Sequence, residues 1–302
     1  MIIITLLLAA TSFVYAANNI GVIRTAFSGS TGRGLWLYLC LSLVGFTAGF
    51  ALEGHKIGTS ITNGLTHLDP TASIVALSVT LLILSIFTFL KLPVSISNVA
   101  VGAIIGSAFA FGLPISTWNL VRVLASWLVA PLTSAILVLA IYFSYCRGVS
   151  GLPLGPASRL NRLLEMLAIG FSSYSLSANN LGILVGFSEG TTDAVITLFF
   201  ALLGSITLSG LVAWTLGYRI ASLSPTAYAS ALLAGSLTLW IYTQFGIPAS
   251  MAQTVISAMM VLSILKRPSI VNRRVMFEIL GSWPFFLVFA TILSFSIGIL
   301  LI

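Results

Sequence analysis

Apolar stretches separated by short polar connections follow one another along the whole chain. Stretches of 18 or more residues with almost no charge are typical of transmembrane helices. The pattern therefore predicts an all-α polytopic membrane protein, with five apolar segments in each half of the chain. The expected segments are 2–25, 35–53, 71–90, 94–112 and 118–144, followed by 163–187, 194–217, 226–243, 247–265 and 276–301.

Three short motifs occur twice in the same order, which indicates an internal repeat. The sequence ANNIGV at 17–22 returns as ANNLGI at 178–183, and LPVS at 92–95 returns as IPAS at 247–250. A Ser-Trp pair opens an apolar helix in each half, at 126–127 and at 282–283. The first repeat is therefore expected to cover 1–146, and the second 163–302. Residues 147–162, rich in Gly and Pro, form the predicted cytoplasmic linker.

Five segments per half is an odd number, so the second repeat is predicted to be inverted relative to the first. Inverted repeats are typical of secondary transporters, whose substrate site lies near the membrane midplane where the repeats meet. In each half, the third and fourth segments either both span the membrane or form a re-entrant hairpin around the proline. The sequence leaves these two alternatives open for 71–112 and 226–265, because both give the same crossing parity.

Composition supports a membrane protein, with 58% hydrophobic and only 6% charged residues. A soluble domain averages about 25% charged residues. The net charge is +7. We expect the basic residues to anchor cytoplasmic loops and not to bind nucleic acid, because no basic run with interleaved aromatic residues occurs. Residues 1–16 lack the basic region of a secretory signal, so they are expected to begin the first transmembrane helix. Cys40 and Cys146 are expected to pack as small apolar side chains.

The basic residues predict the orientation in the membrane. Placing both termini outside puts ten of the thirteen Lys and Arg residues on the cytoplasmic side, as the positive-inside rule requires. The expected location is a cell membrane, with the central linker cytoplasmic. These ten residues are Arg24, Arg33, Arg147, Arg159, Arg162, Arg219, Lys266, Arg267, Arg273 and Arg274.

The paired asparagines Asn18-Asn19 and Asn179-Asn180 are the clearest polar feature inside apolar segments. An unpaired amide in hydrocarbon costs several kcal/mol, so these side chains must find partners. Asn followed closely by Gly also disfavours a helix interior, and we expect a broken helix in each half. The freed groups could coordinate an ion; alternatively, the amides only bond neighbouring helices together. The duplication favours the ion or substrate site.

The two proline motifs predict the tips of broken elements. A helix that starts after Pro93 or Pro248 presents free N–H groups and a positive dipole end, which suit an anion. An ordinary N-cap by Ser95 or Ser250 is the alternative reading. The glycines at 102, 106, 204 and 210 are expected to allow close helix packing. No paired carboxylates, metal-ligand spacing or nucleophile–base set occurs, so an enzyme is not expected.

These motifs resemble those of the inorganic phosphate transporter (PiT) family, of the phosphate or sulfate permease type. Residues 16–22 and 177–183 resemble the duplicated family signature Gly-Ala-Asn-Asp-Val-Ala-Asn. Residues 93–103 and 248–254 resemble its second element, Pro-Val-Ser-Thr-Thr-His, whose later copy often has Gln in place of His. The resemblance covers nearly the whole chain. It implies a phosphate or similar oxyanion carrier, with these polar positions binding the anion and its coupling cations.

The chain departs from the family pattern at the charged position of each signature. Asn19 and Asn180 stand where the family has Asp, and Ile96 and Met251 stand where it has Thr. Losing two carboxylates weakens an oxygen-ligand site for a hard cation such as Na⁺. The resemblance still implies the fold, but coupling to Na⁺ or H⁺ becomes an open question.

The sequence thus predicts a secondary transporter that moves inorganic phosphate or a similar small oxyanion by alternating access. The alternatives are an uncoupled anion channel or carrier, and a membrane sensor of the same fold that does not transport. The expected partners are the oxyanion and the lipid bilayer, with a homodimer as one possible assembly and no nucleic acid. No cofactor is expected beyond a coupling ion. The candidate binding residues are Asn18, Asn19, Ser95, Ser97, Asn98, Asn179, Asn180, Ser250, Gln253 and Thr254.

Overall fold

A computed structural model describes residues 2–24, 32–92, 94–188, 190–208, 223–266 and 273–302, which contain helices and no strand. The first half contains α1 (Ile2–Arg24), α2 (Gly32–Thr59), the π-helical η2 (Ser60–Leu65), α3 (Pro70–Phe89), α4 (Ile96–Ala110) and α5 (Thr117–Val149). The second contains α6 (Leu154–Leu176), the π-helical η3 (Ser177–Leu181), α7 (Gly182–Val185), α8 (Thr191–Thr207), α10 (Pro225–Gln244), α11 (Met251–Lys266) and α12 (Arg273–Leu300).

Within the described residues, each predicted apolar segment contains helix, and five helices are long and apolar enough to cross a membrane. The largest difference in helix bounds is at the predicted linker. α5 continues to Val149 and α6 already begins at Leu154, so most of 147–162 is helical. Apolar periodicity did not reveal these turns because they extend beyond the apolar stretch. The end of the predicted segment 194–217, from residue 209 onward, lies outside the described residues.

Two helical hairpins, α3–α4 and α10–α11, occupy equivalent places in the two halves. α3 begins with the cap Asp69 before Pro70, and α10 begins with the cap Ser224 before Pro225. α4 has 15 residues and α11 has 16, which correspond to about 23–24 Å of helix. A hydrocarbon core is about 30 Å thick. Both returning helices are therefore too short to span it, which favours the re-entrant hairpin.

The turn at each hairpin tip follows the same hydrogen-bond pattern. The Leu92 N–H donates to Phe87 O across six residues, and the Ile247 N–H donates to Tyr242 O in the same way. This is the Schellman end of a helix, which needs one residue in the left-handed region. Lys91, with φ of 60°, and Gly246, with φ of 65°, hold that position.

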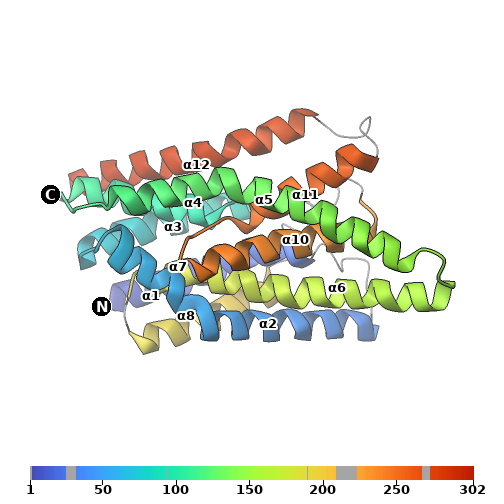
Figure 1. Cartoon of the computed structure of the whole chain (residues 1–302). Coiled ribbons are helices and arrows are strands. Elements are labelled where there is room, and N and C mark those ends of the chain that lie inside the picture. The colour runs from blue at the N-terminus through green and yellow to red at the C-terminus, as the bar shows by residue number, and fades with distance from the viewer. Residues whose placement is uncertain (1, 25–31, 93, 189, 209–222, 267–272) are drawn as a thin grey trace.

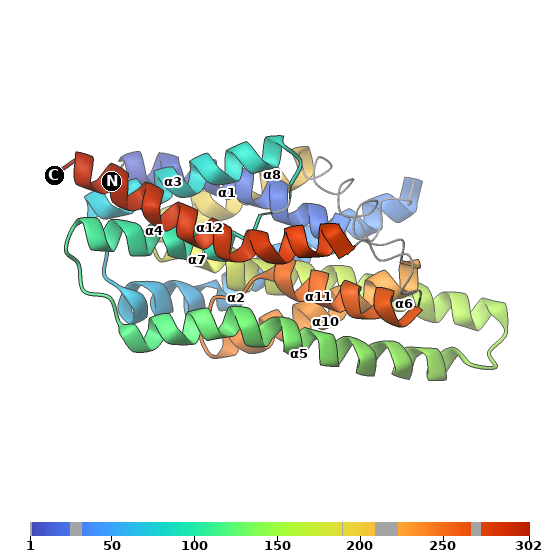
Figure 2. The ribbon, with the colours of Figure 1, turned by 90° about the horizontal axis from the view of Figure 1, so that it is seen from above.

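The helices of the two halves pack in matching pairs. α1 packs against α8 as α2 packs against α6, and α4 packs against α12 as α5 packs against α11 (Figures 1 and 2). The hydroxyl of Tyr15 donates to the carbonyl of Leu176, 161 residues away. This is also the offset between the two Asn-Asn motifs, so Tyr15 and Leu176 are equivalent positions. Two equivalent positions in contact lie where an axis relating the halves would pass.

Several of the predicted packing glycines do allow close helix contacts. A Cβ at Gly102 or Gly106 of α4 would overlap the backbone of α12, and a Cβ at Gly204 of α8 would overlap the backbone of α1 at Phe13. These contacts join helices from different halves. Gly210 lies outside the described residues.

The expected broken helix is present in the second half only. There the backbone widens to a π-helix at Ser177–Leu181, across Asn179 and Asn180. In the first half, α1 continues as an α-helix through Asn18 and Asn19, so the prediction of a break there is wrong. The physical reason is that the Asn18 and Asn19 side chains find partners without unwinding the helix.

Both termini lie at one end of the molecule, and the α5–α6 turn lies at the other (Figure 1). The inverted orientation of the repeats in the membrane and the side that faces the cytoplasm stay predictions.

Candidate functional site

The tip of the first hairpin is held by Asn18 of α1. The Asn18 amide nitrogen donates to Thr88 Oγ1 at 2.9 Å and to the carbonyl of Leu92 at 3.0 Å. Its amide oxygen accepts from the backbone N–H of Val94 at 3.0 Å. The side chain is 1% exposed. One buried amide thus pairs the carbonyl of Leu92 and the N–H of Val94, two non-helical backbone groups that would otherwise lack partners.

Asn179 holds the second hairpin tip in the same way. Its nitrogen donates to Thr243 Oγ1 at 3.0 Å and to the carbonyl of Ile247 at 3.1 Å, and its oxygen accepts from the Ala249 N–H at 2.9 Å. The three contacts reproduce those of Asn18 position for position. The first asparagine of each pair is therefore a tip-holding residue whose two N–H donors are both used by the protein.

The second asparagine of each pair is bonded differently in the two halves. The Asn180 nitrogen donates to the carbonyl of Ala249 at 2.8 Å, whereas the Asn19 nitrogen donates to the carbonyl of Tyr15 in its own helix at 3.2 Å. Within the described residues, the buried Asn180 Oδ1 has no hydrogen-bond partner. Of the four asparagines, Asn180 therefore presents a clearly unused acceptor.

The N-terminus of α4 carries three candidate side chains of the first tip. Ser95 is the N-cap, and its hydroxyl accepts from the Asn98 N–H. The Asn98 amide oxygen lies 2.8 Å from Ser95 Oγ and 3.4 Å from Ser97 Oγ, and both hydroxyls donate to it. The Asn98 nitrogen donates to the carbonyl of Trp283 in α12 at 2.9 Å. The cluster is buried and links α4 to the opposite half.

The second tip is simpler. Ser250 Oγ accepts from the Gln253 N–H at 3.3 Å, so Ser250 caps α11 as Ser95 caps α4. The Thr254 hydroxyl donates to the carbonyl of Met251. The Thr254 carbonyl in turn accepts from Ser134 of α5 at 2.8 Å. The N-cap reading of both serines is thus correct, and it leaves the anion-site reading in place because a capped helix still ends in oriented N–H groups.

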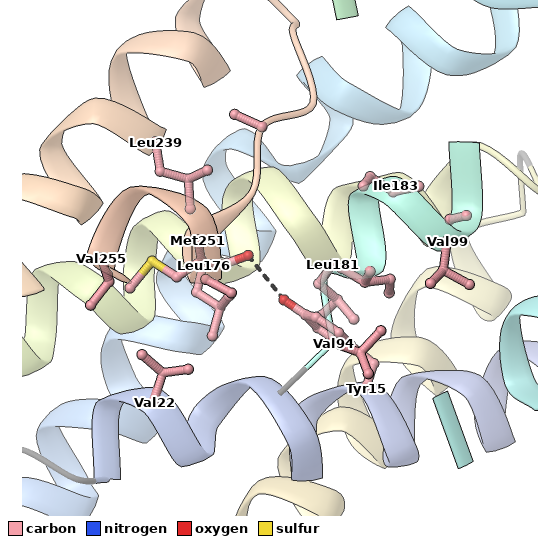
Figure 3. Packing of buried hydrophobic residues seen from close by; sticks show 14 of the residues in the cluster. Tyr15, Val22, Val94, Val99, Leu176, Leu181, Ile183, Leu239, Met251 and Val255 are labelled. Atoms are coloured by element: carbon pink, nitrogen blue, oxygen red, sulfur yellow. Dashed lines mark hydrogen bonds between the residues drawn. The ribbon is translucent and has the colours of Figure 1, made fainter. Parts of the chain in front are cut away.

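Apolar side chains fill the space between the two tips. Figure 3 shows Val94 and Met251 near the Tyr15–Leu176 hydrogen bond, with Leu181 close by. All five residues are buried. The structure therefore places buried apolar side chains between the two tips. It brings Asn18 onto the first tip and both Asn179 and Asn180 onto the second, whereas Asn19 bonds its own helix.

Sequence reasoning missed Thr88, Thr243 and Tyr15. Thr88 and Thr243 accept the amide donors of the two tip-holding asparagines. They lie 155 residues apart, which is the offset between the LPVS and IPAS motifs. A search for polar residues in register between the two halves would have found them. Tyr15 gave no such signal, because its equivalent is Leu176.

The chemistry of this site is neutral. The tips supply hydroxyls and the N–H groups of two helix N-termini, which suit an oxyanion. Among the described residues, no group of three or more His, Cys, Asp or Glu side chains could hold a metal ion.

A cluster of charged and polar residues bonds the end of α10 next to the second tip. Lys56 Nζ is 3.1 Å from Glu53 Oε1 and donates to Gln244 Oε1 at 2.7 Å. The Gln244 nitrogen donates to both Glu53 oxygens. Arg122 of α5 donates to the carbonyl of Phe245 at 3.3 Å. We call these five residues the outer clamp. It ties the end of α10 to α2 and α5 of the other half.

A comparison with known protein families decides the assignment. The sequence model of the phosphate transporter family matches residues 5–138 and 155–294, in two parts that correspond to the two repeats. The chain belongs to the phosphate transporter family. The match includes every candidate binding residue.

Relatives and a solved structure agree with this assignment. A Methanocaldococcus jannaschii protein named as a candidate phosphate permease is 23% identical over 95% of this chain and 93% of its own length. The sulfate permease CysP of Bacillus subtilis is 27% identical over 98% of this chain and 87% of its own. A solved sodium-dependent phosphate transporter has the same fold, with a TM-score of 0.81, 16% identity and coverage of 99% of this chain and 98% of that one.

Proposed function

We propose that this protein is a secondary transporter that carries inorganic phosphate, or a closely related oxyanion, across the membrane by alternating access. The observation that supports the proposal best is the pair of hairpin tips, each held by a buried asparagine and each starting a capped helix at the centre of the molecule. Membership of the phosphate transporter family supports the choice of substrate.

The anion would bind at the two tips. The N-termini of α4 and α11 present oriented N–H groups and the positive ends of two helix dipoles. The Ser250 hydroxyl adds a donor at the second turn, and the Ser95 hydroxyl adds one at the first when it turns away from Asn98 Oδ1. These groups stabilise negative charge without a buried cation. The buried apolar side chains between the tips would have to separate toward one side and then the other, as alternating access requires.

Cation coupling is the least supported part of the function. Na⁺ prefers oxygen ligands, and carboxylates bind hard cations more strongly than amides. In this chain, Asn19 and Asn180 stand where the duplicated family signature has Asp. We therefore propose transport with weak or no dependence on a cation gradient. One relative is named a sulfate permease, so sulfate is the competing substrate to test.

Uptake of radiolabelled phosphate into proteoliposomes tests this proposal. The purified protein is assayed with an inward sodium gradient, an inward proton gradient or no cation gradient, each with and without excess sulfate. We expect saturable uptake of similar size in all three conditions, reduced by unlabelled phosphate. Saturable uptake that requires one gradient would overturn the uncoupled mechanism, and uptake no faster than in empty liposomes would overturn transport of phosphate.

Two sets of variants test the location of the site. The double variant Ser95→Ala and Ser250→Ala should lower uptake at least tenfold, while the loss of each cap costs only about 1 kcal/mol of stability. Ser116→Ala is the matched control, because Ser116 caps α5 away from the tips. The double variant Asn19→Asp and Asn180→Asp should be stabilised against heat by Na⁺, and the parent protein should not. Unchanged uptake in the serine variant would place the anion elsewhere.

A further inference from the structure

The helix contacts divide the molecule into two groups that differ from the two repeats. α1, α3 and α4 pack with α8 and α12, whereas α6, α10 and α11 pack with α2 and α5. We call the first group the α1 body and the second group the α6 body. In Figure 2, α1, α3, α8 and α12 lie on one side of the molecule, and α5, α6 and α10 lie on the other. Each body thus combines helices of both repeats.

Backbone contacts at glycines hold each body together. In the α6 body, a Cβ at Gly45 of α2 would overlap the carbonyl of Gly170 in α6, and a Cβ at Gly235 of α10 would overlap Val255 of α11. The glycines of α4 and α8 described above do the same in the α1 body. None of the described glycines makes such a contact between the two bodies. Helices that approach this closely have little freedom to slide, so each body is expected to move as a unit.

The boundary between the bodies is packed more loosely. α1 contacts α6 and α11 at few positions, and α2 contacts α8 at few positions. A cavity of about 700 Å³ lies on the boundary, with walls from α4 and α12 on one side and from α5 and α11 on the other. Low contact density marks the places where a protein opens most easily. The boundary is therefore where the two bodies can separate.

Each body carries one tip of the proposed anion site. The N-terminus of α4, capped by Ser95, belongs to the α1 body, and the N-terminus of α11, capped by Ser250, belongs to the α6 body. Opening of the boundary would separate these two helix ends. An anion bound by both would draw the bodies together, because each end is positive.

Two buried tyrosines form hydrogen bonds across the boundary, one from each body. Tyr15 of α1 donates to the carbonyl of Leu176 in α6 at 3.2 Å (Figure 3), and Tyr228 of α10 donates to the carbonyl of Val22 in α1 at 2.6 Å. Tyr15 is 0% exposed and Tyr228 is 6% exposed. Val22 lies in the last turn of α1, where helix carbonyls have no partner within the helix. Each of these bonds can break without disturbing the packing inside either body.

We propose that the α1 body moves against the α6 body during alternating access, and that Tyr15 and Tyr228 are positioning residues that hold the two bodies in the state described here. This inference rests on the proposed function and adds to it the moving parts and the residues that control them. Motion of one repeat against the other is the simplest expectation for an inverted-repeat transporter, but each repeat is divided between the bodies. The outer clamp lies inside the α6 body, so any opening of it is a local movement of the second tip.

Spin-label distances in proteoliposomes, measured by double electron–electron resonance, test which parts move. The native cysteines are first removed by Cys40→Ala and Cys146→Ala. Pairs of new cysteines then carry the labels, at exposed positions on four helices that represent each body and each repeat. These substitutions are Ile3→Cys in α1, Leu52→Cys in α2, Leu167→Cys in α6 and Val195→Cys in α8.

The four pairs distinguish motion of the bodies from motion of the repeats. The pairs 3–52 and 167–195 each lie within one repeat but join different bodies, whereas the pairs 3–195 and 52–167 each lie within one body but join different repeats. We expect the first two pairs to show two distances that differ by about 5 Å or more, roughly one helical turn. Their proportions should change when phosphate is added. The last two pairs should show one distance that phosphate does not change.

Tyrosine variants test the role of the two hydroxyls. Tyr15→Phe and Tyr228→Phe keep the ring and remove the donor, and each should raise the population of the second distance about fivefold, the typical effect of one hydrogen bond. Tyr38→Phe is the matched control, because Tyr38 is also buried and donates to Glu165 inside the α6 body. The control should leave all four pairs unchanged.

The outcomes separate this inference from the proposed function. A change confined to the pairs 3–195 and 52–167 would mean that the repeats move as units, which overturns the inference. One distance in every pair, in the parent and in both tyrosine variants, would overturn it as well, even where phosphate uptake is saturable. A response to Tyr38→Phe as large as that to Tyr15→Phe would overturn the role of the tyrosines. Two distances in the expected pairs without any phosphate uptake would support the two bodies and overturn phosphate transport instead.

Discussion

The two hairpin tips make the same contacts at one asparagine and different contacts at the next. Asn18 and Asn179 each bond a threonine, a carbonyl and an N–H, in the same relative positions. Asn180 also bonds its tip, whereas Asn19 bonds its own helix. The shared contacts build the fold, since both halves need them. The contacts that differ show that the two halves are not held in the same way at the second asparagine.

The outer clamp adds to this difference. Gln244 and Phe245 at the second tip are bonded by Lys56, Glu53 and Arg122. The second tip is thus attached on two sides in the state described here. Under the proposed alternating access, we expect this attachment to open in the other state. Substitutions at the two tips test whether they differ as their contacts do.

The largest effect is expected from the tip-holding asparagines. Asn18→Leu and Asn179→Leu each leave a backbone carbonyl and an N–H unpaired, at about 1–3 kcal/mol apiece. Both variants should lose similar stability, equivalent to about 5 °C or more in apparent Tm, measured by thermal unfolding in detergent. Asn63→Leu, at an exposed position in η2, is the control. If Asn18→Leu unfolds like the control, the equivalence of the two tips is wrong.

A smaller effect should separate the second asparagines. Asn180→Leu removes a bond between η3 and the tip, while Asn19→Leu removes only a bond to a carbonyl of its own helix. We expect Asn180→Leu to cost about 1–3 kcal/mol and Asn19→Leu about 1 kcal/mol or less. The same unfolding assay measures both. Equal losses of stability would mean that the different partners of Asn19 and Asn180 do not affect the free energy of unfolding.

The turn residues should respond in opposite directions. Lys91 holds the left-handed position that Gly246 holds in the second half, and a side chain there costs roughly 1–2 kcal/mol. Lys91→Gly should therefore stabilise the protein by about 1 kcal/mol. Gly246→Ala should destabilise it by about the same amount or more, because its Cβ would also lie 3.3 Å from the carbonyl oxygen of Lys56. Destabilisation by Lys91→Gly would show that the Lys91 side chain contributes more than its strain costs.

The smallest effect on stability is expected at the outer clamp. The Lys56 and Glu53 side chains are 32% and 14% exposed, and such pairs contribute about 0–1 kcal/mol. Glu53→Gln should leave the apparent Tm within about 2 °C while increasing the accessibility of Ile247→Cys, at the half-buried tip, to a membrane-impermeant thiol reagent. Unchanged accessibility would mean that the clamp does not restrain the second tip.

Much of the fold could be predicted from the sequence, because the apolar segments and the duplicated motifs are local signals. The Asn-Asn motifs contain the residues that hold the tips, Asn18 and Asn179, whereas their role in binding an ion or substrate stays a prediction. Pro93 lies outside the described residues. The sequence could not predict which asparagine of each pair holds the tip. Asn18 and Asn19 are chemically identical, and only packing shows that Asn18 reaches Leu92. The intact α1 was missed for the same reason. The unpaired Asn180 Oδ1 also follows from tertiary contacts alone.

Counterflow tests the central claim most directly, because it asks whether one site faces the two sides in turn. Proteoliposomes loaded with unlabelled phosphate are diluted into a trace of radiolabelled phosphate with no cation gradient. The account predicts transient accumulation of label above equilibrium, abolished in the double variant Ser95→Ala and Ser250→Ala and retained in Ser116→Ala. Equilibration without overshoot, at a rate that does not saturate with phosphate, would indicate a channel and contradict alternating access.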